Sequence, residues 1–259
     1  MPEVSILLPL HDCEKTIANT LDSICDQTYR DFELIAVDNN CSDNTMNIVE
    51  SYSSRLPIKS FFCATPGIVA ALNTGLKESY TDYIARIDGD DTWKPEKLAK
   101  QMKYLKANPD IGVIGTQIDI VDVDGSPISE GTMGLDVVYP VGDNRIKTLL
   151  LMGENPICHP SIVMIRKLFE VVGGYESFFP RAEDLHLWLK LIPHTKFANL
   201  EEKLTVYTQK KDDDYDARVP LVLADMYYSM YKTVGMVEGE RPKRIYDWQL
   251  DPSFHGNVR

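Results

Sequence analysis

The sequence contains no block of lysine and arginine residues. Its 27 basic residues are outnumbered by 39 acidic ones, which gives a net charge of −12. Nucleic-acid binding rests on cationic side chains that neutralise phosphates, so this composition excludes a general nucleic-acid partner. An acidic patch that binds an anionic ligand must therefore obtain its positive charge from a metal ion.

Long apolar runs are also missing. No stretch approaches the roughly 20 residues that a membrane helix needs, so we expect no transmembrane segment and at most a peripheral contact with a membrane. The apolar run 4–10 has no basic segment before it and no small-residue cleavage site after it, which indicates a buried strand and not a signal peptide. We expect a soluble protein of the cytoplasm.

Cysteine and histidine are scarce. The five cysteines form no Cys-x-x-Cys pair, which fits neither a disulfide framework nor a zinc site, so we expect reduced, structural thiols at Cys13, Cys25, Cys41, Cys63 and Cys158. The histidines show no metal-ligand spacing, and ordinary polar roles are expected for most of them: His11, His159, His186, His194 and His255.

What the sequence does have is enough apolar material for one globular domain, with 44% hydrophobic residues in a chain of 259. Strands are predicted at residues 4–8, 32–37, 58–62 and 83–87, and each is followed by a segment with helical spacing of apolar residues. Strands that alternate with helices predict an α/β fold, with a mostly parallel, doubly wound sheet and helices on both faces.

The pattern changes at about residue 119. A hairpin is predicted around Asp124 and Gly125, and looser sequence follows to about Pro156. A strand is then predicted at 161–166, a helix at 182–192, a strand at 203–207 and a last helix at 219–233, before a polar tail. No internal repeat or linker divides the chain, so we expect a single domain over residues 1–259.

Polar residues follow three of the predicted strands. Asp38 and Asn39 end the second strand, and Asp88, Asp90 and Asp91 end the fourth, while the first ends at "PLHD". Open parallel sheets bind ligands beyond the carboxyl ends of their strands, so these groups should share one edge. A simpler interpretation also exists: Asp and Asn favour turns, and acidic residues favour the start of a helix.

No glycine-rich phosphate loop is present, neither Gly-x-Gly-x-x-Gly nor Gly-x-x-x-x-Gly-Lys-Ser/Thr. Dinucleotide and ATP-type sites are therefore not expected. Carboxylates repel a diphosphate unless a hard divalent cation, which prefers oxygen ligands, lies between them. The acidic stretch "DGDD" is thus predicted to be a metal bridge.

Several segments resemble family 2 glycosyltransferases. "VSILLPLHDCEKTIANTLDSICDQTYRDFELIAVDNNCSDNT" is similar to the family's V-S-V-I-I-P-x-Y-N…L-x-S-I-x-x-Q-T-Y…E-I-I-V-V-D-D-G-S-x-D-x-T pattern. "NTGLKESYTDYIARIDGDD" resembles its N-x-G-I…G-x-Y-I-A-R-x-D-x-D-D segment, and "HPSIVMIRKLFEVVGGYESFFPRAEDLHLWLKL" its H-P-S…G-G-Y…E-D-Y-D-L-W-L-R segment. The match covers most of residues 3–210. It implies a GT-A fold and an enzyme that transfers sugar from a nucleotide donor with inversion.

The resemblance also implies roles for the donor-binding residues. Pro9 and His11 would flank the nucleotide base, and Asp38 would accept a hydrogen bond from uracil. Asp88 would meet the ribose or the diphosphate, and Asp90 would coordinate Mg²⁺ or Mn²⁺. By the same resemblance, about 1–117 would form the nucleotide-sugar-binding half, about 118–215 the acceptor half, and about 216–259 a C-terminal helix and tail.

The acceptor half carries the implied catalytic group. Asp184 resembles the family's general base, and Glu183 would bind the acceptor or orient its neighbour; helix capping is the alternative for both. Replacing a nucleoside diphosphate at a sugar carbon needs a base and a Lewis acid, which agrees with one carboxylate and one metal. Further candidate contacts to donor or acceptor are Asp91, which could instead support the metal, Trp188, which is otherwise a core residue, and His159.

The sequence departs from the family pattern in four places. His11-Asp12 replaces Tyr-Asn, "DNNCSDNT" replaces D-D-G-S-x-D-x-T, His186 stands where Asp is frequent, and "VYTQKK" replaces a Tyr-Arg followed by His. Lys210 or Lys211 could supply the positive charge that the last change removes.

The resemblance thus implies a hexosyl- or N-acetylhexosaminyltransferase that uses a UDP-sugar and a glycan or lipid-linked acceptor. Two alternatives remain. A nucleotide-sugar-binding protein without turnover has the same motifs, and a sugar nucleotidyltransferase shares the scaffold, although such enzymes have a glycine-rich, basic loop that "PLHDCEK" lacks.

Overall fold

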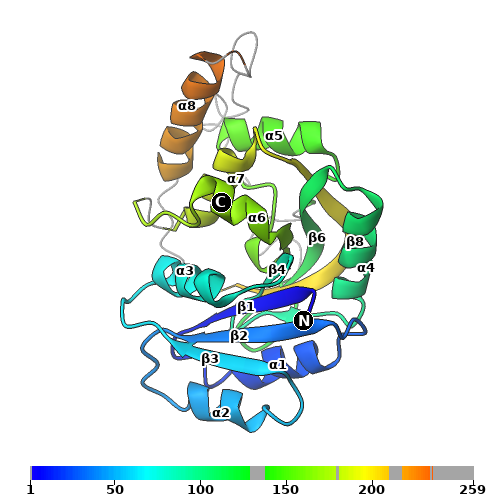
Figure 1. Ribbon diagram of the computed structural model, residues 1–259, viewed down its shortest axis with the longest axis vertical. Helices are drawn as coiled ribbons and strands as arrows, with labels where there is room; N and C mark the ends of the chain where they lie inside the picture. Colours follow the sequence, from blue (N-terminus) through cyan, green and yellow to red (C-terminus); the bar gives the residue numbers. More distant parts are fainter. Residues whose placement is uncertain (1, 129–137, 179–180, 210–217, 234, 236–259) are drawn as a thin grey trace.

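The computed structural model describes residues 2–128, 138–178, 181–209, 218–233 and 235 (Figure 1). The elements run in the order β1 (Val4–Leu10), α1 (Ile17–Cys25), β2 (Phe32–Asp38), α2 (Thr45–Ser51), β3 (Ile58–Phe62), α3 (Ile68–Glu78), β4 (Tyr83–Arg86), β5 (Thr92–Trp93), α4 (Lys97–Ala107), β6 (Ile111–Val121), α5 (Asp143–Met152), the 3₁₀ turn η1 (His159–Ser161), β7 (Val163–Ile165), α6 (Arg166–Val172), α7 (Glu183–Leu191), β8 (Lys196–Thr208) and α8 (Arg218–Thr233).

The described strands form one mixed sheet in the order β3-β2-β1-β4-β7-β6-β8-β5. The first four are parallel neighbours, as are β6 and β8, whereas β7 and β5 run antiparallel to the strands beside them. The mostly parallel sheet expected from the alternating pattern is therefore confirmed. Its parallel strands bring the ends of β1, β2 and β4 to one edge.

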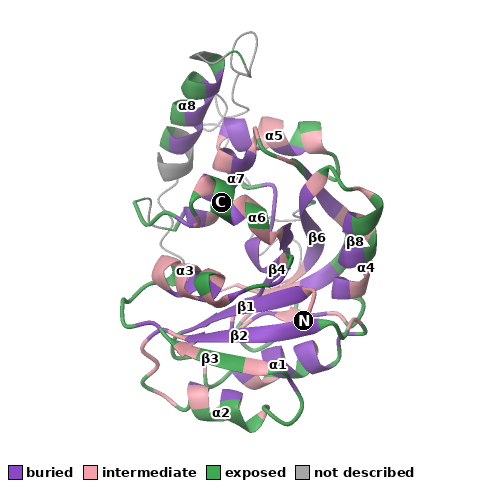
Figure 2. Ribbon diagram, viewed as in Figure 1, coloured by how far each residue is buried: buried purple, intermediate pink, exposed green. Residues whose placement is uncertain are grey.

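Both faces of the sheet are covered by helices, so β1 and β2 are buried on both sides, whereas the edge strand β3 is partly exposed (Figure 2). Successive side chains of a strand point to opposite faces. In β1, Leu7 packs into the core under α3, α5, α6, α7 and α8, while Ile6 and Leu8 pack into the core under α1, α2 and α4. A strand with two apolar faces reads as a continuous apolar run, which explains the sequence of β1 and β2.

Sequence analysis located the first four strands and their helices, and the turn around Gly125 is present, with a φ of 78° and an N–H donated to Asp122 O at 2.9 Å. The expectation of looser sequence from the hairpin to about Pro156 was wrong over α5. That helix buries Ile146 and Leu150, but its ten residues include a polar first turn that weakens the periodic signal. Strands β5 and β6 and helix α6 were also not anticipated.

From the sequence alone, Ser42 or Asp43 of "DNNCSDNT" is the expected cap of the second helix, but α2 begins at Thr45 with Asn44 at the N-cap. Asp43 still accepts a hydrogen bond from the Thr45 N–H at 2.9 Å. The helix after the acidic stretch is expected to start at Pro95, a favoured first-turn residue, but α4 begins two residues later at Lys97. Such shifts are typical at helix ends, where the side-chain signal is short.

All five cysteines are free thiols, as expected. Within the part of the chain that the structure describes, no helix is long and apolar enough to cross a membrane. Lys210, Lys211 and the polar tail beyond residue 235 lie outside the described residues.

Candidate active site

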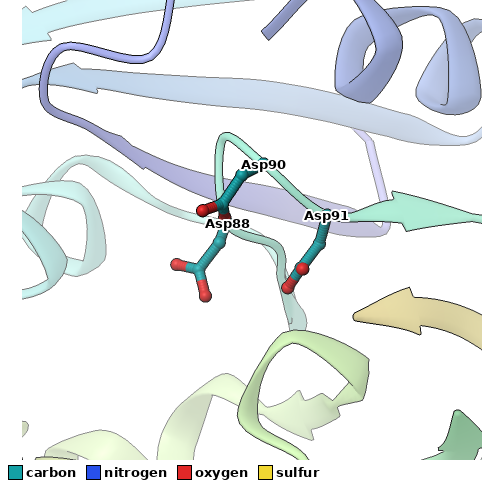
Figure 3. A group of neighbouring side chains, drawn as sticks. All are labelled: Asp88, Asp90 and Asp91. Carbon is teal, nitrogen blue, oxygen red and sulfur yellow. The ribbon is translucent and has the colours of Figure 1, made fainter. Parts of the chain in front are cut away.

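Three carboxylates gather on the loop between β4 and β5. Asp88, Asp90 and Asp91 each offer an oxygen, and these oxygens all lie within 4.8 Å of one another. In Figure 3 the three side chains converge on the same side of the loop. Carboxylate oxygens at this spacing are the ligands that hard divalent cations prefer.

Asp91 is the most buried of the three, with 1% of its surface exposed. The Thr208 N–H donates to its Oδ1 at 2.7 Å, whereas its Oδ2 is buried without a hydrogen-bond partner. Burial, and then repulsion from Asp88 and Asp90, raise the pKa of Asp91 well above its usual value. A buried oxygen without a partner costs free energy, so these residues fit a bound cation that would supply the partner.

Arg86 at the end of β4 lies buried next to this cluster. One guanidinium nitrogen is 2.5 Å from Asp88 Oδ1, and the Nε atom is buried without a partner. Attraction to Asp88, Asp91 and Glu183 favours the charged form against the cost of burial. Sequence analysis assigned no role to Arg86, although "ARIDGDD" places it two residues before the first carboxylate.

Two threonines at the start of α1, the N-cap Thr16 and Thr20, hold the acidic loop in place. Thr16 Oγ1 donates to Gly89 O at 2.7 Å, and Thr20 Oγ1 donates to Asp91 O at 2.8 Å. A Cβ atom on Gly89 would come within 2.7 Å of the Cys13 sulfur, so only glycine fits between the neighbouring acids without a shift. The carboxylates are thus presented on a loop fixed by backbone contacts.

The carboxyl ends of β1 and β2 lie beside the end of β4, along the same edge of the sheet as the acidic loop. Asp38 Oδ1 accepts a hydrogen bond from the Cys41 N–H at 2.8 Å, the geometry of a turn stabilised by an aspartate side chain. Buried Asn39 donates to Thr65 O at 2.7 Å, and His11 Nδ1 lies 2.9 Å from Asn39 O. Pro9 is buried within β1, and His11 is exposed. The turn interpretation of Asp38 is therefore realised, whatever else the carboxylate binds.

Glu183 and Asp184 form the first turn of α7. Glu183 is 9% exposed, and its Oε2 is buried without a partner. Burial, followed by repulsion from Asp184, raises the pKa of Glu183 to about 7. Asp184 is partly exposed; Asn155 Nδ2 donates to its Oδ2 at 2.6 Å and the Leu185 N–H to its Oδ1 at 2.7 Å. Burial raises the pKa of Asp184 as well, although the bond from Asn155 lowers it.

The remaining sequence candidates lie in the interior. Trp188 has no exposed surface, which agrees with a core residue and leaves no face for a sugar. His159 is buried, its Nε2 lies 2.7 Å from the Tyr175 hydroxyl, and its ring meets Trp188 edge-on at 5.7 Å. Burial lowers the pKa of His159, so the imidazole is neutral at pH 7. His186 lies 2.8 Å from the Tyr227 hydroxyl.

The mixed sheet with helices on both faces is the GT-A fold, and the aspartate cluster lies at the carboxyl end of its parallel strand β4. The sequence model of the family described as "Glycosyl transferase family 2" matches residues 5–173, more than half of the chain. The chain belongs to this family and is a glycosyltransferase.

Its similarity to named relatives extends over most of its length. EpsE of Bacillus subtilis (strain 168), named as a glycosyltransferase, is 32% identical over 219 residues, which cover 82% of this chain and 74% of EpsE. The O-antigen biosynthesis glycosyltransferase WbnJ of Escherichia coli is 29% identical over 209 residues, or 79% of this chain and 78% of WbnJ.

Solved structures share the fold at low sequence identity. TarS 1–349 of S. aureus, crystallised with UDP-GlcNAc, has a TM-score of 0.66 at 18% identity and covers 90% of this chain, with 73% of TarS aligned. The mannosyltransferase PcManGT of Pyrobaculum calidifontis, in complex with GDP-Man and Mn²⁺, has a TM-score of 0.63 at 19% identity, with 93% of this chain and 66% of PcManGT covered.

Proposed function

We propose that this glycosyltransferase moves a hexosyl or N-acetylhexosaminyl unit from a UDP-sugar to a hydroxyl of a glycan or lipid-linked acceptor, with inversion and with Mn²⁺ or Mg²⁺. The observation that supports this proposal is that acidic residues gather at two places, which belong to different elements of the fold. The cluster Asp88, Asp90 and Asp91 follows β4, whereas Glu183 and Asp184 begin α7. The solved relatives bound to UDP-GlcNAc, or to GDP-Man and Mn²⁺, support a nucleotide-sugar donor and a divalent cation.

Asp184 is the proposed general base. It accepts the proton of the acceptor hydroxyl while that oxygen forms a bond to the anomeric carbon. The bond from this carbon to the diphosphate oxygen breaks, and its electron pair leaves on the diphosphate. An inverting displacement needs the base and the leaving group on opposite faces of the sugar, and acidic groups that come from two different elements are compatible with this arrangement. Glu183 binds the acceptor or orients Asp184.

The donor is assigned to the edge formed by β1, β2 and β4. Asp38 accepts the uracil N3–H, with Pro9 and His11 beside the base, and Asp88 meets the ribose or the diphosphate. Asp90 holds the cation, with Asp91 as a neighbouring ligand or sugar contact. When bound, that cation supplies Lewis-acid stabilisation of the diphosphate leaving group. Residues about 1–117 thus serve the donor and about 118–215 the acceptor.

A panel of nucleotide sugars, tested with Mn²⁺ for binding and slow hydrolysis, examines this proposal. UDP-sugars should bind and be hydrolysed, and one of them should dominate. A protein that binds a donor but never releases UDP, even with added glycan acceptors, would be a nucleotide-sugar-binding protein. Release of pyrophosphate from a nucleoside triphosphate and a sugar phosphate would instead identify a nucleotidyltransferase.

A further inference from the structure

Asn155 lies between α5 and η1, in a segment with no assigned function. Its amide Nδ2 donates a hydrogen bond to Asp184 Oδ2 at 2.6 Å, although the two residues are 29 positions apart in the chain. Asn155 is exposed and Asp184 is partly exposed, so this bond is accessible to solvent.

The segment that carries Asn155 is fixed to the sheet. Asn199, which is buried in β8, donates from Nδ2 to Pro156 O at 3.0 Å and to Pro140 O at 2.8 Å. A few residues further on, the Trp93 indole N–H donates to Pro160 O at 2.9 Å. These bonds hold the backbone after Asn155, and directly before it the Glu154 N–H donates to Leu149 O at 3.0 Å at the end of α5. The amide of Asn155 therefore reaches Asp184 from a rigid support.

We propose that Asn155 is a positioning residue, which orients the carboxylate of Asp184 and keeps it ready to accept the proton of the acceptor hydroxyl. The inference rests on the proposed role of Asp184. It adds a residue outside the family motifs in which the catalytic carboxylates were recognised.

The chemistry follows from the direction of the hydrogen bond. An N–H donor stabilises a carboxylate anion and not a protonated acid, so Asn155 favours the form that can act as a base. The Leu185 N–H holds the other oxygen at 2.7 Å, which fixes the plane of the carboxylate. Each oxygen has a second lone pair, so one hydrogen bond does not prevent either oxygen from accepting a proton.

Other titratable and charged groups face Asp184 from the elements around it. Arg86 of β4 favours its anion, whereas Glu183 of α7 repels it when ionised. Tyr175, which follows α6, and Tyr139, which precedes α5, also interact with it, and burial keeps both phenols neutral. Because Glu183 and Asp184 lie next to each other and interact, the acid limb of the pH–rate profile reports the ionisation of both carboxyl groups together.

The test compares pH–rate profiles of the full chain and its Asn155→Ala and Asn155→Asp variants, using the donor identified by the panel. Asn155→Ala should move the acid limb of kcat to higher pH by about one unit, so that kcat falls about tenfold at the acid end and converges with wild type at high pH. Asn155→Asp places a second carboxylate beside the base and should move the limb further.

Asn47→Ala is the matched control. Asn47 is also exposed, and its amide makes a hydrogen bond of 2.7 Å to Asn44, on α2 and away from α7. The acid limb of its kcat–pH profile should be the same as that of the wild-type protein. UDP affinity and the thermal midpoint are measured for every variant, since a positioning role leaves UDP affinity unchanged.

The inference is overturned if the acid limb of the kcat–pH profile is the same in Asn155→Ala as in the wild-type protein. An equal loss of kcat at every pH accompanied by weaker UDP binding also overturns it, because that pattern indicates a structural role. Asp184→Asn separates the two proposals. If Asp184→Asn is inactive and the Asn155→Ala limb is unshifted, only the role of Asn155 fails; if Asp184→Asn retains turnover, the proposed base fails and the role of Asn155 with it.

Discussion

Thr208 donates its backbone N–H to Asp91 Oδ1 at 2.7 Å, across 117 positions of the chain. Its hydroxyl also donates to Asp90 O at 2.6 Å. The last residue of β8 therefore holds the acidic loop that follows β4. The geometry of the carboxylates depends on a strand from the second half of the sequence, so the two halves form one site.

Metal dependence is the first prediction. UDP should bind far more tightly with Mn²⁺ or Mg²⁺ than with EDTA, because the acidic cluster repels a diphosphate until a cation bridges them. Asp90→Ala should abolish the metal effect, and Asp91→Ala should weaken it less. Isothermal titration calorimetry measures each affinity.

Asp110→Ala is the control for this series, since Asp110 is an exposed acid paired with Lys196. It removes the same charge from the chain without touching the cluster and should leave the metal effect intact. Equal UDP affinity with Mn²⁺ and with EDTA in the wild-type protein would refute the metal bridge.

Asp38 should contribute to recognition of the base. Asp38→Ala is expected to weaken UDP binding by about 1 to 3 kcal/mol, the cost of losing a charged hydrogen-bond partner. Asp38→Asn retains an oxygen that can accept the Cys41 N–H, so it preserves the turn while removing the charge. If titration with UDP shows no loss in Asp38→Ala, another residue reads the base. If Asp38→Asn binds like wild type, the turn matters more than the charge.

Asp184→Asn tests the general base. The substitution keeps the shape of the side chain and removes the proton acceptor, so transfer should fall by about 10² to 10⁴-fold while UDP and metal affinities stay nearly constant. Steady-state transfer and calorimetry are both required. A near-native rate would leave Asp184 as a helix cap and make Glu183 the next candidate, whereas a parallel loss of donor binding would place Asp184 in the nucleotide pocket.

Burial of Glu183 predicts a pH-dependent stability. Its pKa is raised from 4.5 to about 7, so the folded protein binds this proton more tightly than the unfolded chain, and stability falls as pH rises between these values. Glu183→Gln should therefore stabilise the protein at pH 8 by about 3 kcal/mol at most, and have little effect at pH 4. Urea unfolding at both pH values measures the difference; the same change at both would mean that Glu183 ionises normally.

The sequence was sufficient to predict the sheet edge at which β1, β2 and β4 end. Its strands are apolar runs that end at polar residues, and those residues are contiguous with the strands, as at Asp38 and Asp88. Helix α5 was not anticipated because Ile146 and Leu150 form only a short periodic stretch after a polar turn. The sequence therefore located the elements that have a long apolar pattern or a clear polar residue at their end.

Contacts between distant segments could not be predicted in the same way. The bond between Asn155 and Asp184 and the buried position of Arg86 depend on how α7 and the 155–161 segment pack against β4 and β8. A single sequence contains no record of that packing. The motif "ARIDGDD" held the one available signal for Arg86, because a charged residue at the end of an apolar strand is unusual unless it has a partner.

The contact between Gly89 and the Cys13 sulfur also bears on how this chain can diverge. A side chain at position 89 needs space that Cys13 occupies, and a smaller residue at position 13 is what would release it. We therefore expect a residue larger than glycine at position 89 only in chains that also have a side chain smaller than cysteine at position 13. Single substitutions of Gly89 should accordingly be rare among descendants of this chain.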